Sequence, residues 1–252
     1  MKLFNRILEG LITFAAMGKH KLERFEAIKS FVNVFEYPPN MPGNWARYFG
    51  NNHQITLELG CGRGEYSVGL ARLLKEGNFI GMDIKGNRIW KGAKTALEEG
   101  LKNVAFIRSQ IEQVANYFGP EEIKNIWVTF PDPQLRDSKM KKRLTHPRFL
   151  RLYQQFLAKD GLVHLKTDSP DLYGFTKTMI SLYGLTLITD YDDIYGKGVA
   201  TEILSIKTHY EQLDIAKSQK VHYLCFRLDK DLPLEKDKEL RALFSSEQDA
   251  ES

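Results

Sequence analysis

The stretch IWVTFPDPQLRDSKMKKRLTHPRFLR, residues 126–151, is the part of the chain from which fold and function are read most directly. It begins with an apolar run of β-branched and aromatic residues, Ile126 to Phe130, which predicts a buried strand. The run stops at Pro131-Asp132-Pro133, because each proline removes a backbone donor and fixes φ. Ligands of open α/β sheets bind at the carboxyl ends of the strands. We therefore expect the Asp132 carboxylate to be held in a stiff turn at a ligand-binding edge.

The loop that follows this turn is strongly basic. Its cations, opposed only by Asp137, are Arg136, Lys139, Lys141, Lys142, Arg143, Arg148 and Arg151. A cationic loop beside a fixed acid indicates a reaction centre next to a surface that binds a polyanion. The alternative is a solvated loop in which the aspartate only caps the turn.

Strand and helix patterns alternate on both sides of this stretch. The predicted strands are 55–59, 78–82, 104–108, 126–130, 161–166, 185–189 and 221–228, and the predicted helices are 68–74, 85–99, 149–157 and 170–183. This alternation predicts an α/β fold with a seven-stranded, mostly parallel sheet. The last two strands have no long helix between them, which favours an antiparallel edge.

Three parts of the chain differ in character. Residues 1–54 form a predicted helical extension and linker, with apolar residues at helical spacing between Leu3 and Phe14 and a proline-rich break at 38–43. Residues 55–230 hold the alternating pattern and form the predicted main domain. Residues 231–252 are polar and then acidic, which predicts a solvated tail.

Bulk properties narrow the class of protein. The net charge of the 252 residues is only +4, so the clustering of charge carries more information than its total. Cys61 and Cys225 are far apart and the six histidines have no metal-ligand spacing, so we expect a reducing cytoplasm and no structural zinc. The apolar run 7–17 is too short to span a membrane.

A glycine-rich loop follows the first strand of the main domain, in the sequence LELGCGRGEY, residues 57–66. Gly60, Gly62 and Gly64 let the backbone turn from strand to helix close to a ligand. A dinucleotide-binding loop would place its third glycine at position 65, which is Glu65 here. The spacing G-x-G-x-G, preceded by Glu58, is more typical of enzymes that use S-adenosylmethionine (SAM).

Two polar residues follow the next strands. Asp83 ends the second strand of the main domain, where a carboxylate accepts hydrogen bonds from ribose hydroxyls. That role fits a nicotinamide cofactor and SAM equally well. Gln110 follows the third strand and could read an adenine amino group, or simply begin a helix.

Five motifs occur along the chain in one order. They are Glu58-Leu59-Gly60-Cys61-Gly62, Phe130-Pro131-Asp132-Pro133, Lys142-Arg143-Leu144-Thr145, Lys166-Thr167-Asp168 and Thr208-His209-Tyr210-Glu211. This order resembles the bacterial tRNA (guanine-N7-)-methyltransferases of the TrmB family, over roughly residues 55–228. The resemblance implies a Rossmann-like class I SAM-dependent methyltransferase fold and methyl transfer to N7 of a variable-loop guanosine, tRNA position 46.

The resemblance also implies roles for individual residues. It places Asp132 where donor and acceptor meet, and it lines the SAM pocket with Glu58, Gly60, Gly62, Asp83, Gln110 and Asp132. The substrate-binding positions are Arg136, Asp168, Thr208, His209, Tyr210 and Glu211, and the RNA-contacting residues are Lys139, Lys141, Lys142 and Arg143. The sequence departs from the family pattern at Gln134, usually tryptophan, at Arg136, usually lysine, and at Gln110, usually aspartate.

The chemistry of the residues agrees with this family. Guanine N7 has an available lone pair, so methylation there requires positioning and a dry site rather than a base. Neither cysteine follows a proline, unlike the nucleophile of cytosine-C5 methyltransferases. Alternative readings are a non-catalytic RNA-interaction module, a methyltransferase of another RNA base, or a nicotinamide-dependent oxidoreductase. The sequence leaves open a monomer or homodimer, the preferred tRNAs, and whether Asp132 contacts base, donor or both.

Overall fold

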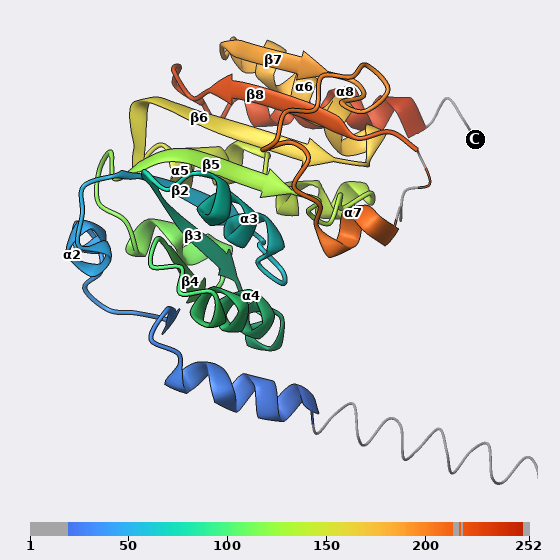
Figure 1. The fold of residues 1–252 in the computed structure, drawn as a ribbon. Coiled ribbons are helices and arrows are strands. Elements are labelled where there is room, and N and C mark those ends of the chain that lie inside the picture. The colour runs from blue at the N-terminus through green and yellow to red at the C-terminus, as the bar shows by residue number, and fades with distance from the viewer. Residues whose placement is uncertain (1–19, 214–216, 218, 249–252) are drawn as a thin grey trace, which may run out of the picture.

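A computed structural model describes residues 20–213, 217 and 219–248, and Figure 1 shows their arrangement. The amphipathic helix predicted between Leu3 and Phe14 lies outside these residues. The described chain begins with a helix over residues 20–27, which continues into the short 3-10 helix η1 (Ile28–Ser30).

One eight-stranded sheet runs through the molecule in the order β1-β4-β3-β2-β5-β6-β8-β7. The strands are β1 (Val34–Glu36), β2 (Gln54–Leu59), β3 (Gly77–Asp83), β4 (Val104–Arg108), β5 (Ile123–Thr129), β6 (Leu157–Thr167), β7 (Leu187–Tyr191) and β8 (His222–Arg227). All neighbours are parallel except β8, which is antiparallel to β6 and β7. The α/β prediction is confirmed. The strand count is eight rather than seven, because β1 pairs with β4 outside the predicted main domain.

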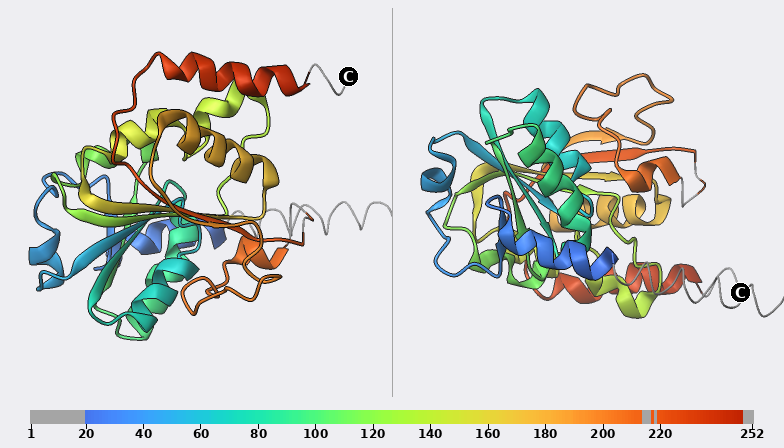
Figure 2. Two further views of the ribbon diagram at one scale, coloured as in Figure 1. Left: turned by 90° about the horizontal axis from the view of Figure 1, so that it is seen from above. Right: turned by 60° about the horizontal axis from the view of Figure 1, so that its bottom comes forward.

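Helices cover both faces of the sheet (Figure 2). They are α2 (Trp45–Phe49), α3 (Glu65–Leu73), α4 (Gly86–Glu98), α5 (Pro147–Tyr153), α6 (Pro170–Tyr183), α7 (His209–Leu213) and α8 (Lys236–Gln248), with 3-10 helices η2 (Ile111–Asn116) and η3 (Asp137–Lys142). The face of α3 and α4 also carries α7, whereas α5, α6 and α8 lie on the opposite face.

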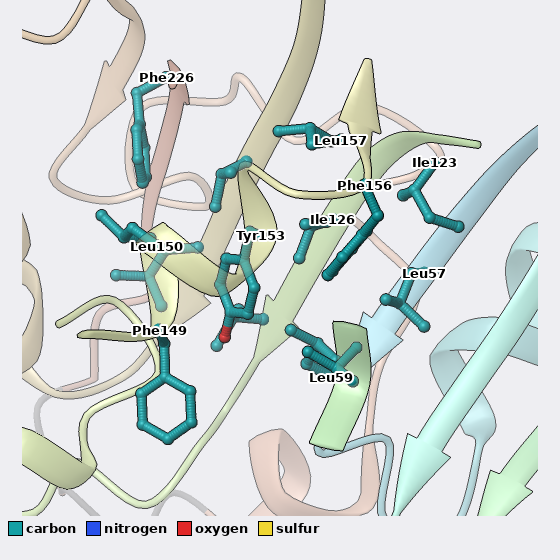
Figure 3. Packing of buried hydrophobic residues seen from close by; sticks show 14 of the residues in the cluster. Leu57, Leu59, Ile123, Ile126, Phe149, Leu150, Tyr153, Phe156, Leu157 and Phe226 are labelled. Atoms are coloured by element: carbon teal, nitrogen blue, oxygen red, sulfur yellow. The ribbon is translucent and has the colours of Figure 1, made fainter. Parts of the chain in front are cut away.

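The core has one apolar layer on each face, as expected for strands that helices cover on both sides. Figure 3 shows the layer beneath α5, where Leu57 and Leu59 of β2 lie near Tyr153 and Phe156. The other layer contains Tyr66 of α3, Phe79, Phe106 and Trp127. Burial of this apolar area fixes the register of the central strands, and therefore the height at which each strand ends.

Several predicted boundaries differ from the structure; β6, for example, begins at Leu157 instead of residue 161. The helix predicted at 149–157 begins earlier, at Pro147, where the His146 side chain accepts a hydrogen bond from the Arg148 amide (3.1 Å), and it ends at Tyr153. The acidic segment 231–252, predicted as a solvated tail, contains α8, whose Leu240 is fully buried. The division of the chain at residues 54 and 230 stays a prediction.

Candidate active site

The predicted site segments meet at the carboxyl edge of the sheet. The glycine loop follows β2, Asp83 ends β3, Gln110 lies just beyond β4, and the Pro131–Pro133 turn lies just beyond β5. Leu59 at the end of β2 lies level with Met82 of β3 and Val128 of β5. Because these strands are parallel and in register, the four segments are neighbours in space, as predicted.

The glycine loop depends on its third glycine for packing. Gly64 has φ +72°, and a Cβ atom there would lie 2.5 Å from Phe106 Cε1 and 3.3 Å from Gly92 Cα. The absence of a side chain therefore lets the start of α3 approach α4 and β4 closely. Gly62, at φ +55°, is buried in the turn against Tyr210, whose ring would lie 3.6 Å from a Cβ at that position.

Asp83 ties this loop to the next turn. Its Oδ2 accepts a hydrogen bond from the Gly62 amide (3.0 Å), and its Oδ1 accepts one from the Lys85 amide (2.8 Å). A carboxylate oxygen has two lone pairs, so each oxygen can accept a second hydrogen bond. The position and remaining acceptor capacity of Asp83 fit the predicted contact with ribose hydroxyls.

Glu58 lies beneath the loop rather than on its surface. Its side chain is 2% exposed, with Oε2 accepting from the Ser67 amide (3.0 Å) and hydroxyl and Oε1 from the Thr129 hydroxyl (2.6 Å). The carboxylate thereby joins the first turn of α3 to the end of β5. Burial raises the pKa of Glu58 to about 7, although the hydrogen bonds from Ser67 and Thr129 lower it in part. A direct contact with the cofactor stays a prediction.

The raised pKa makes stability depend on pH. Between about 4.5 and 7 the folded chain holds a proton on Glu58 that the unfolded chain releases, so stability falls as pH rises through this window. Above pH 7 the folded chain carries the full free-energy cost of ionising this buried carboxylate, about 3 kcal/mol. Glu58→Gln should therefore match the parent near pH 5 and exceed it in stability near pH 8, as measured by urea unfolding.

Glu235→Gln is the matched control, because Glu235 is exposed. It should leave the pH profile of stability unchanged. A stability difference between Glu58→Gln and the parent that is constant from pH 5 to pH 8 would exclude a titrating Glu58.

The turn after β5 is tightly constrained. Phe130 (φ +44°) and Gln134 (φ +51°) adopt left-handed backbone conformations on either side of the two prolines. Asp132 is exposed, and its Oδ1 accepts a hydrogen bond from the Gln134 amide (3.0 Å). The predicted stiff turn is therefore present, and its carboxylate faces the outside of the fold at the carboxyl edge.

Arg143 supports this turn instead of facing solvent. Its Nε donates to the Pro133 carbonyl (3.1 Å) and its Nη2 to the Gln134 carbonyl (3.3 Å), and the guanidinium lies over the Phe175 ring at 4.5 Å. The residue is 4% exposed, and burial lowers its pKa. The predicted RNA contact of Arg143 does not fit this position. Lys139, Lys141 and Lys142 of η3 are exposed, as is Arg136 before it.

The segment 208–211 lies against the glycine loop. Thr208 is buried, and its hydroxyl accepts a hydrogen bond from the Glu211 amide (3.2 Å), which begins α7. The Tyr210 ring packs against Gly62 and carries the Arg88 guanidinium at 5.4 Å. His209 lies edge-on to Tyr210 at 5.7 Å. Two aromatic rings therefore border the proposed cofactor loop.

Glu211 is engaged by the protein itself. Its Oε2 lies 2.9 Å from Lys166 Nζ, and its Oε1 accepts a hydrogen bond from the Tyr195 hydroxyl (2.5 Å). Lys166 is fully buried and also donates to the Ile206 carbonyl (3.0 Å). Contact between Glu211 and the substrate, the predicted role, would require these bonds to rearrange.

Sequence reasoning did not assign Lys166 and Tyr195 to this arrangement. A lysine inside the apolar strand GLVHLK was the available signal, because a buried ammonium requires a partner. Asp168 follows two residues later and is partly exposed at the same edge.

Other predicted features can be placed simply. Gln110 is exposed and precedes η2, but its side chain makes no capping hydrogen bond, so helix capping does not account for it. Burial raises the pKa of the Cys61 thiol well above its usual range, which suits a packing residue. Among residues 20–213 and 219–248, no group of three or more His, Cys, Asp or Glu side chains is arranged so that it could hold a metal ion. The described helices include none with the length and apolar character needed to cross a membrane.

Comparisons with solved structures show the fold. The chain resembles the 16S rRNA methyltransferase KamB, with a TM-score of 0.55 and 14% identity, over 73% of this chain and 91% of that one. It also resembles the 16S rRNA (adenine(1408)-N(1))-methyltransferase from Catenulisporales acidiphilia, with a TM-score of 0.54 and 15% identity, over 76% and 94%.

Comparisons with sequences show the family. The profile of the family described as "Putative methyltransferase" matches residues 52–224. The tRNA (guanine-N(7)-)-methyltransferase of Bacteroides thetaiotaomicron is 47% identical over 84% of this chain and 87% of its own length. The tRNA (guanine-N(7)-)-methyltransferase of Porphyromonas gingivalis is 48% identical over 80% of this chain and 86% of its own length. The profile match spans the positions of all five motifs on which the resemblance was based, and the chain belongs to the tRNA (guanine-N7-)-methyltransferase family.

Proposed function

We propose that the chain transfers the methyl group of SAM to N7 of a guanosine in the variable loop of tRNA, at position 46. The observation that carries this proposal is the meeting of the glycine loop, Asp83 and the Asp132 turn at one sheet edge, in a chain 47% identical to a tRNA (guanine-N7-)-methyltransferase. The fold alone would not identify the methyl acceptor, because one fold can serve many different functions. The proposal therefore rests on the combination.

The donor site fits the residues present. The backbone has positive φ at Gly60, Gly62 and Gly64, so the loop turns sharply from β2 into α3 at the carboxyl edge of the sheet. Asp83 would accept hydrogen bonds from the ribose, and exposed Gln110 would contact the base. SAM supplies an electrophilic methyl group. The chain's own task is to hold donor and acceptor in line and to exclude water.

Asp132 is the proposed catalytic residue. Guanine gains positive charge as N7 is methylated, and a fixed carboxylate nearby stabilises that charge. The side chain is held through the Gln134 amide, so it requires little reorganisation during the reaction. It is exposed in the free chain, and a docked RNA would cover it. The attraction between carboxylate and purinium grows as water leaves.

Positively charged and aromatic side chains support the proposed binding of RNA. Exposed Lys139, Lys141 and Lys142 on η3, with Arg136, are proposed phosphate contacts. Tyr210 offers a stacking face beside the glycine loop, and Asp168 lies at the same edge. With both described cysteines unpaired, we propose a cytoplasmic protein, monomeric or homodimeric.

The test uses unmodified tRNA and methyl-labelled SAM, followed by mass analysis of the nucleosides. We expect label only in 7-methylguanosine, and none when the target guanosine is replaced by 7-deazaguanosine, which lacks the N7 lone pair. Label in another base would replace the proposed acceptor. Tight RNA binding without any transfer would favour a non-catalytic RNA-interaction module.

A further inference from the structure

A second cationic surface lies on α4, on the opposite face of the sheet from the helices α5 and α6. Cations recur there at every third position, at Lys85, Arg88, Lys91 and Lys94, a spacing that places them along one side of a helix. A groove of about 570 Å³ follows this side, which we call the α4 groove. Its walls add Arg24 from the N-terminal helix and Arg63 from the glycine loop.

The charges of the α4 groove are poorly compensated. The groove is lined by five cations and by one carboxylate, Glu98, which pairs with Lys94 (2.5 Å). Within residues 20–213 and 219–248, the other four cations, Arg24, Arg63, Arg88 and Lys91, have no carboxylate at ion-pair distance. Four like charges gathered along one groove repel one another and attract a polyanion.

Aromatic rings stand between these charges. The Arg24 guanidinium lies over Trp90 at 4.8 Å, and that of Arg88 lies over Tyr210 at 5.4 Å. A guanidinium stacked on a ring keeps its N–H groups in its own plane, where they can donate to phosphate oxygens. Cations interleaved with aromatic faces are typical of surfaces that bind nucleic acid, since the rings can also stack on bases.

The groove borders the proposed cofactor loop. Its lining includes Arg63 of the glycine loop and His209 and Tyr210 of α7. A polynucleotide with its target base at the carboxyl edge would therefore pass along α4. We propose that the α4 groove binds the phosphate backbone of the RNA substrate next to the target nucleotide, as a second contact surface besides η3. The identity of this RNA as tRNA rests on the proposed function.

Charge reversal tests the groove. In Arg24→Glu/Lys91→Glu, both altered side chains are exposed and neither belongs to the proposed catalytic machinery. The matched control is Lys102→Glu/Lys159→Glu, which makes the same change in net charge at exposed positions near the amino ends of β4 and β6. Affinity for unmodified tRNA is measured over a range of salt concentrations, together with affinity for S-adenosylhomocysteine.

The groove variant should bind tRNA at least about tenfold more weakly than the control at low salt, with a salt slope smaller by about 1.5, the loss of two phosphate contacts. Its affinity for S-adenosylhomocysteine should match that of the parent, which shows that the cofactor pocket is intact. Equal tRNA affinity and salt slope in the groove variant and the control would overturn the proposal.

Lysine acetylation tests the same surface in the unaltered chain. Saturating tRNA should protect Lys91 and Lys94 several-fold and leave Lys102 and Lys159 unchanged. Equal labelling of Lys91 with and without tRNA would overturn the proposal, as would equal protection by polyglutamate, which would indicate an acidic protein partner. Methyl transfer by the parent is scored separately, so failure of the proposed function and failure of the groove remain distinguishable.

Discussion

Replacing Asp132 with asparagine should lower the rate of methyl transfer by about a hundredfold or more, with little change in affinity for tRNA. The size follows from groups that stabilise charge developing in a transition state, whose removal costs about 10²–10³ in kcat. Asparagine keeps an Oδ1 that can accept the hydrogen bond from the Gln134 amide, so the turn should persist. Single-turnover transfer of labelled methyl to tRNA measures the effect.

Asp137→Asn is the control for this change, because Asp137 lies in the same basic loop and also carries one negative charge. It should leave the transfer rate within about threefold of the parent, because Asp137 is partly exposed, lies outside the Pro131–Pro133 turn and is screened by solvent and salt. Unchanged turnover in Asp132→Asn would remove Asp132 from the mechanism. A loss of tRNA affinity that accounts for the whole rate effect would make it a binding residue.

Replacing Lys166 with methionine should destabilise the fold by about 3–5 kcal/mol, because it leaves the Glu211 carboxylate buried without its cation. Lys166 is fully buried, and its ammonium lies 2.9 Å from Glu211 Oε2. The side chain of Glu211 is 5% exposed, so water cannot replace the missing partner while α7 stays docked. Urea unfolding of the single variant measures the loss.

The double variant Lys166→Met/Glu211→Gln should recover much of this stability, because it removes the unpaired charge as well. Lys177→Met serves as control, since its ion pair with Asp190 is partly exposed and should contribute less than about 1 kcal/mol. A single variant at Lys166 that is no less stable than Lys177→Met would show that the buried pair does not hold α7.

The fold could be predicted from sequence because its signals are local. Apolar runs of five residues, ended by Gly60, Asp83 and Pro131, marked β2, β3 and β5, and Pro170 marked the start of α6. β1 was missed because three partly buried residues carry too little periodicity. α8 was missed because most of its residues are polar or charged, and its packing depends on a few apolar side chains such as Leu240.

The site was predicted less completely, because the side chains that matter find partners far away in the sequence. In the sequence, Arg143 and its neighbours Lys141 and Lys142 are three positive charges that cannot be told apart. Only the tertiary structure shows that the Arg143 side chain is buried. The partner of Glu211 lies 45 residues earlier, in β6. The cations of the α4 groove were visible as a three-residue spacing, but the rings beside them come from α4 itself and α7.

The buried guanidinium of Arg143 has a consequence for substrate selection. Arg143 follows η3 directly, and its guanidinium donates hydrogen bonds to the carbonyls of Pro133 and Gln134. The lysine-bearing helix η3 is therefore coupled to the turn that carries Asp132. An RNA whose phosphates bind to η3 would therefore also restrict the motion of the turn. The rate of methyl transfer would then depend on the length and charge of the acceptor. A free nucleoside has no phosphates to bind to η3 and would leave the turn less ordered.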